Sequence, residues 1–218
     1  MHRRRTAIAL SAALAAAPLL TACGSTAHPG AAAVVGGQRI TVAQLEDRVN
    51  EVRTAQRAAA TNDAQYAQTL ARTGSLTRDT LHSLVLDRVL RRAAKDAGVS
   101  VTRRDVQEMR ASLEQQAGGA KALRSAWLDQ YGVAPQRVDD SLRTEIEAQK
   151  LAAALGADMN TTDGKAMFWK AMSQASKELH VDLNPRYGTW DVQKSSRVDA
   201  KTPWVKEVTA ATTQQQTA

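Results

Sequence analysis

Apolar residues recur every three to four positions along most of the chain, a spacing that places them on one face of an α-helix. The pattern predicts six helices, at residues 42–60, 78–97, 103–116, 121–131, 135–155 and 163–179. The second segment has the broadest apolar band, so we expect it to be the central helix. The polar stretch at residues 61–75 shows no such band, and the pattern makes no prediction for it.

Three threonines mark helix starts. Thr41, Thr77 and Thr102 each stand just before a periodic segment and follow an apolar residue, an arrangement typical of an N-cap with a hydrophobic staple. Gly98 ends the second helix, and Pro135 begins the fifth at a position that tolerates proline. Capping chemistry therefore supports the boundaries that the periodicity predicts.

The period changes at both ends of the helical region. Residues 181–184 alternate like a strand, and Pro185 restricts that strand to a sheet edge. Residues 34–35 precede a Gly-Gly turn and also suggest a strand, and we expect the two to pair. The predicted fold is all-α, a bundle of about six helices with a small two-stranded ribbon joining its ends. The folded domain spans residues 34–191, after a flexible tether at 23–33 and before a disordered tail at 192–218.

The N-terminus has the features of an export signal. Three arginines precede an apolar stretch at residues 6–19, which is too short to span a bilayer. The Leu-Thr-Ala-Cys sequence at residues 20–23 resembles the lipobox of bacterial lipoproteins. This resemblance implies removal of residues 1–22, acylation of Cys23 and a lipid-anchored protein on the extracytoplasmic face of the membrane. The alternative is an ordinary signal peptide with a chance cysteine.

Composition narrows the possible partners and chemistry. Residues 1–22 hold three arginines and no acid, so the mature chain has 26 Lys and Arg against 22 Asp and Glu. No basic run is interleaved with aromatic residues, so we expect no nucleic-acid partner. A single cysteine excludes an internal disulfide and a cysteine-based zinc site. We also expect no metal site from His28, His82 and His180, and no catalytic motif or cofactor site is present.

Four segments resemble a known family in order along the chain. Residues 33–41 resemble the opening of SurA/PrsA-type foldases, and residues 84–99 and 101–106 resemble their second helix and the segment that follows it. Residues 184–190 resemble the closing motif of SurA N-terminal-type lipoproteins. The resemblance implies a chaperone domain. Foldases of this kind often carry a parvulin prolyl-isomerase domain before the last helix, but here only residues 157–162 fill that gap. We therefore expect chaperone binding without isomerase chemistry, and no catalytic residue.

This interpretation predicts binding of unfolded or secreted polypeptides at an aromatic groove. The candidate client-binding residues are Trp127, Tyr187 and Trp190, because aromatic side chains offer broad apolar faces at a modest entropy cost. The alternative places Phe168, Trp169 and Trp190 in the core. A second function also stays open, that of an adaptor lipoprotein that binds one specific folded envelope partner.

Overall fold

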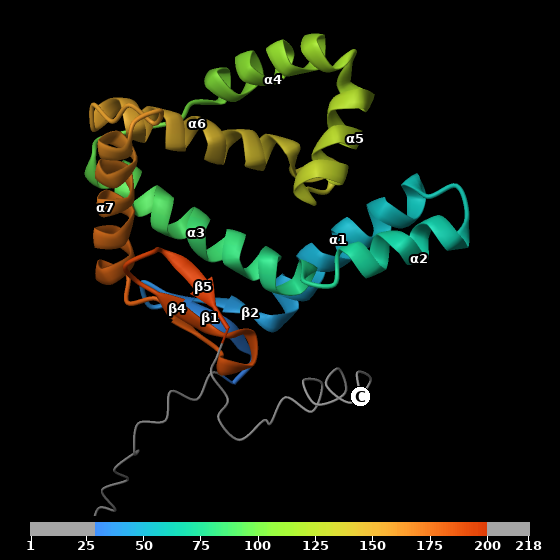
Figure 1. Cartoon of the computed structure of the whole chain (residues 1–218), viewed down its shortest axis with the longest axis horizontal. Helices are drawn as coiled ribbons and strands as arrows, with labels where there is room; N and C mark the ends of the chain where they lie inside the picture. Colours follow the sequence, from blue (N-terminus) through green and yellow to red (C-terminus); the bar gives the residue numbers. More distant parts are fainter. Residues whose placement is uncertain (1–28, 200–218) are drawn as a thin grey trace, which may run out of the picture.

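The computed structural model describes residues 29–199, most of which are helical (Figure 1). The helices in this range are α1 (Val42–Ala59), α2 (Asp63–Arg72), α3 (Leu76–Asp96), α4 (Arg103–Ala117), α5 (Ala120–Tyr131), α6 (Val138–Ala154) and α7 (Thr162–Glu178), with short 3-10 turns at Pro135–Arg137 and Pro185–Tyr187. The strands are β1 (Ala31–Val35), β2 (Gln38–Thr41), β3 (Asp182–Leu183), β4 (Thr189–Asp191) and β5 (Ser196–Val198). The predicted all-α fold with a small sheet is confirmed.

Two of the three predicted threonine caps are present. Thr41 and Thr102 each accept a hydrogen bond from the backbone of the third helical residue, and that residue's side chain accepts one in return. The third expectation was wrong, because α3 begins at Leu76 and places Thr77 inside the helix. Leu76 is buried against Val52, so packing rather than a threonine cap sets this helix start.

The polar stretch after α1 forms a further helix, α2. None of its residues is buried, which is why no apolar period announces it. Asn62 caps its start, and the guanidinium of Arg57 lies 4.9 Å from the ring centre of Tyr66. The far end is held by Arg53, whose Nη2 donates to the carbonyl of Thr73 at 2.8 Å. Polar contacts with α1 therefore hold α2 in place.

The sheet joins the two ends of the domain, as the sequence predicted. β1 lies between β2 and β3, and Val34 stands opposite Asp182 in an antiparallel pair. The ribbon is wider than expected, because it has three strands. Residues 31–33, which the sequence assigned to the tether, are fully buried in β1. An alanine run carries no alternation, so the start of this strand could not be seen in the pattern.

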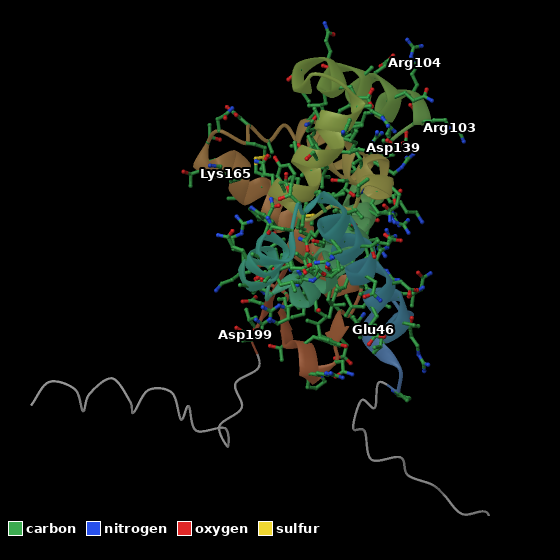
Figure 2. All side chains as sticks on the ribbon, turned by 90° about the vertical axis from the view of Figure 1, so that its right-hand side faces the viewer. Glu46, Arg103, Arg104, Asp139, Lys165 and Asp199 are labelled. Atoms are coloured by element: carbon green, nitrogen blue, oxygen red, sulfur yellow. The ribbon has the colours of Figure 1, made fainter. Side chains whose placement is uncertain are left out.

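A second sheet corrects the predicted start of the tail. β5, which falls in the segment expected to be disordered, pairs with β4 and places Arg197 opposite Trp190. The backbone N–H of Arg197 donates to Nδ1 of His82 on α3 at 3.3 Å, which fixes the hairpin to the central helix. Figure 2 shows Asp199, the last described residue, near the lower end of the domain. The signal peptide, Cys23 and residues 200–218 lie outside the described residues.

The described helices and strands pack around two main hydrophobic cores. The larger core lies between the first sheet, α1, α3, the end of α6 and α7. The smaller core lies within the arm, the name used here for α4, α5 and α6, which Figure 1 shows on the opposite side of α3 from the sheets. A third cluster joins the arm to α1 and α3, and consists of Val52, Leu76, Leu128 and Ala134. The arm therefore contacts α3 in two places, through α6 and through the end of α5.

Candidate binding cleft

A cleft of about 860 Å³ lies between the arm and helices α1 and α3. Its volume is in the range of small-ligand and peptide sites. The lining is largely apolar and comes from both sides of the opening. The apolar lining residues are Val52, Leu76, Leu84, Leu86, Met109, Leu113, Trp127, Tyr131, Val133, Ala134 and Leu142.

Two aromatic residues of α5 form an exposed part of this lining. Trp127 and Tyr131 are one helical turn apart, and their rings meet edge to face with centroids 5.4 Å apart. Trp127 packs partly against the arm core, whereas 58% of the Tyr131 surface is exposed. Gly132 ends α5 in a left-handed conformation directly after Tyr131. The helix end therefore presents two aromatic faces to a segment entering the cleft.

An ion-pair network closes one side of the cleft. Arg137 donates to both carboxylate oxygens of Glu51 on α1, at 2.8 and 2.7 Å, and reaches Asp140 at 3.3 Å. Arg48 lies 3.8 Å from Glu51 and 3.9 Å from Asp140. The hydrogen bonds from Arg137 lower the pKa of Glu51. A bidentate pair of this kind fixes the arm against α1.

A second cavity of about 970 Å³ lies on the other side of this network. It shares Arg48, Glu51, Leu84 and Arg137 with the cleft, but most of its lining residues lie on α1, and most of those are polar. It therefore lacks the aromatic and methionine side chains that make the first cleft suited to apolar segments.

An acidic residue, Asp87, faces the arm from α3. Burial, the largest cause, and nearby Glu147 raise its pKa to about 6. Arg91, Arg48 and a hydrogen bond with Thr144 act in the opposite direction but do not cancel the effect of burial. Burial also raises the pKa of Glu147. The contact between α3 and α6 thus holds carboxyl groups that are costly to ionise.

The raised pKa of Asp87 predicts that the stability of the fold depends on pH. The unfolded chain ionises Asp87 near 3.8 and the folded chain near 6. The free energy of unfolding should therefore fall by up to about 3 kcal/mol as the pH rises from 4 to 6, and the Asp87 contribution should then stay level. In Asp87→Asn this fall should be reduced, and the variant should be the more stable protein at pH 7.5. Urea unfolding of the parent and of Asp87→Asn at pH 4.5, 6 and 7.5 measures the free energy of unfolding of both proteins.

The comparison between variant and parent isolates Asp87 from other groups. Burial and Arg197 lower the pKa of His82, which makes stability rise with pH up to about 6.5 and opposes the Asp87 effect. The hydrogen bond from Lys150 lowers the pKa of Asp105 to about 2, so this group titrates below the pH range of the experiment. If Asp87→Asn and the parent keep the same pH dependence, Asp87 is not buried as described.

The structure separates the three residues predicted to bind clients. Trp127 lines the cleft. Tyr187 is only 8% exposed and belongs to the larger core. Trp190 packs against that core, donates its indole N–H to Ser176 Oγ at 2.5 Å, and lies 5.7 Å from the ring of His82. The grouping of Tyr187 and Trp190 with Trp127 is therefore corrected, because these two side chains pack on the other side of α3.

Two further placements differ from the sequence expectations. Trp169, expected in the core, is 42% exposed on α7, where it packs edge-on against Phe168. Tyr131 was not among the predicted client-binding residues, although its position four residues after Trp127 places it on the same helix face.

No helix among residues 29–199 is long and apolar enough to cross a membrane.

Comparison with known families supports the resemblance seen in the sequence. Residues 2–152, more than half of the chain, match the model of the SurA-like N-terminal domain. The chain belongs to the SurA-like N-terminal domain family. No curated protein and no solved structure matches it.

The matched part of the SurA-like domain contains the whole cleft. Every lining residue falls between Arg48 and Gln149, inside the matched range. Helix α7 and strands β3 and β4 follow the match but complete the larger core beneath α3. The connection from α6 to α7 is short, from Leu155 to Thr161.

Proposed function

We propose that this SurA-like protein is a lipid-anchored, extracytoplasmic chaperone-like protein that binds unfolded or secreted polypeptides without isomerising prolyl bonds. The single observation that carries the proposal is the apolar cleft between the arm and α3, with Trp127 and Tyr131 at its edge. Membership of the SurA-like N-terminal domain family also supports a chaperone-related function.

The mechanism follows from the size and character of the cleft. Burying about 400 Å² of apolar client surface is worth roughly 10 kcal/mol before costs, at about 25 cal/mol per Å². Association and the ordering of the client offset most of that gain. The result is weak binding that reverses without nucleotide. This behaviour suits a protein that must hold a client briefly and release it to fold.

An aggregation assay tests the proposal. The purified chain should suppress light scattering of several unrelated denatured proteins at stoichiometric amounts. Suppression of none, together with capture of one folded partner, would replace the chaperone function with that of an adaptor. Prolyl-isomerase turnover above the uncatalysed rate would contradict the non-enzymatic part of the proposal.

Replacing Cys23 with serine tests the lipid anchor. Without a thiol the chain cannot receive the thioether-linked lipid, so we expect most of it to leave the membrane fraction or to stay unprocessed. The measurement is fractionation of cells followed by detection of the protein and of its apparent mass. An unchanged membrane fraction with unchanged processing would argue against acylation at this position.

A further inference from the structure

The charged residues that line the cleft are predominantly acidic. Among the described residues, its acids are Glu51, Asp79, Asp87, Asp140 and Glu145, and its only lining cations are Arg48 and Arg137. This balance is opposite to that of the chain, which carries a formal net charge of +7. The acidity is therefore a local property of the cleft and does not follow from overall composition.

Both lining cations are already engaged by acids of the cleft. Arg137 is held by Glu51 and Asp140, and Arg48 lies within 4 Å of the same two carboxylates. These four charges neutralise one another. The remaining negative charge belongs to Asp79, Asp87 and Glu145.

The remaining acids come from two facing helices. Asp79 and Asp87 lie on α3, and Glu145 lies on α6. Within residues 29–199 none of the three forms a salt bridge. Asp79 accepts a hydrogen bond from Ser75 Oγ at 2.5 Å, and Glu145 accepts one from Gln149 at 2.9 Å. These neutral donors stabilise the carboxylates of Asp79 and Glu145 without cancelling their charge, and at Asp87 the charges of Arg91 and Arg48 offset the effect of burial only in part.

We infer that the cleft selects apolar polypeptide segments that carry lysine or arginine, and excludes segments that carry acidic residues. The inference deepens the proposed function and rests on it. The apolar part of such a segment would pack against Trp127 and Tyr131, and its cation would lie between α3 and α6. A cation placed there recovers in Coulomb attraction what it loses in hydration.

Exclusion of acidic segments follows from the same charges. A carboxylate brought between Asp87 and Glu145 would lose hydration and meet like charge, and the two arginines that line the cleft are already paired. Repulsive arrangements of this kind usually contribute as much to selectivity as the attractive contacts do. The occupant is thus defined by both its apolar surface and its charge.

Three fluorescein-labelled peptides test the inference by fluorescence anisotropy. They share a Leu-Phe-Ala-Leu centre and differ only in two flanking residues, which are lysine, glutamine or glutamate. With the purified full chain at pH 7.5 we expect the lysine peptide to bind about tenfold more tightly than the glutamine peptide, and the glutamate peptide to bind most weakly. The preference should shrink in 0.5 M NaCl because salt screens charge.

A pair of matched double variants assigns the effect to the cleft. Asp87→Asn with Glu145→Gln should reduce the lysine preference, measured as the ratio of the affinities for the lysine and glutamine peptides, to about twofold or less. The control, Glu108→Gln with Asp129→Asn, removes the same charge from exposed positions of the arm that do not line the cleft. Glu108 pairs with Arg104, which Figure 2 shows at the outer surface of the arm. The control should keep the preference.

The outcomes separate this inference from the proposed function. Equal binding of all three peptides would overturn charge selection and leave apolar binding intact. An equal loss of preference in both double variants would also overturn it, since net charge alone would then explain the effect. Binding of none of the peptides would overturn the proposed function and the inference together.

Discussion

Replacing Trp127 with alanine is expected to weaken binding of the lysine-flanked peptide by about 30-fold or more, the loss typical of a central aromatic contact. Trp127 offers the larger of the two aromatic faces in the cleft, and Tyr131 meets it edge to face. Removal of the indole would take away the apolar surface on which the client packs. Anisotropy titration of the variant measures the loss.

The control for this variant is another tryptophan. Trp169 is 42% exposed on α7 and does not line the cleft, so Trp169→Ala should bind the peptide as the parent does. Trp127 also contacts the arm core, and Tyr131→Ala therefore gives a second test with little structural cost. That variant should bind several-fold more weakly and keep its melting temperature. Parent-like affinity in both cleft variants would show that clients bind elsewhere.

Replacing Gly164 with alanine is expected to give a large loss of stability. A Cβ at this position would lie 2.0 Å from the carbonyl oxygen of Asp158 and 2.6 Å from its backbone nitrogen and carbon. The same carbonyl accepts hydrogen bonds from the backbone and hydroxyl of Thr161, which in turn caps α7 by accepting from the N–H of Gly164. Relief of the clash must therefore break the start of α7.

We expect Gly164→Ala to lower the free energy of unfolding by about 3 kcal/mol or more, and the melting temperature by roughly 10 °C. Urea and thermal unfolding followed by circular dichroism measure both values. Gly156→Ala is the matched control, because Gly156 has a positive φ but nothing within 4 Å of the added carbon. Its cost should be only about 1 kcal/mol. Equal losses in the two variants would mean that α7 does not approach Asp158 this closely.

The sequence predicted a structural feature correctly where that feature depends on residues close together in the chain. The capping boxes at Thr41 and Thr102 involve side chains three residues apart, so the sequence alone predicted them correctly. The join between the chain ends was also predicted, because both segments carried recognisable strand and turn signals. Helix α2 was missed because it has no buried face, and β5 because three residues are too few to show a period.

The candidate site was predictable only in part, because burial is decided by distant segments. Residue type marked both Trp127 and Trp190 as possible contacts with clients. Ser176 and His82, far from Trp190 in sequence, hold it against the core. In the same way, Asp87 stands in an apolar stretch of α3, but burial in the folded chain raises its pKa, and Thr144 and Glu147 of α6 modify that shift. No local pattern contains such information.

The position of β1 in its sheet also constrains how the protein is made. β1 is synthesised before every helix that the structure describes, yet one of its two neighbours is β3, and the backbone N–H of Asn184 donates to the carbonyl of Ala32 at 2.9 Å. A nascent chain that pairs β1 with β2 before residue 184 has been produced therefore carries an open β-edge, which is a template for pairing with other strands. A chain released before that point would expose this edge permanently and would be prone to self-association.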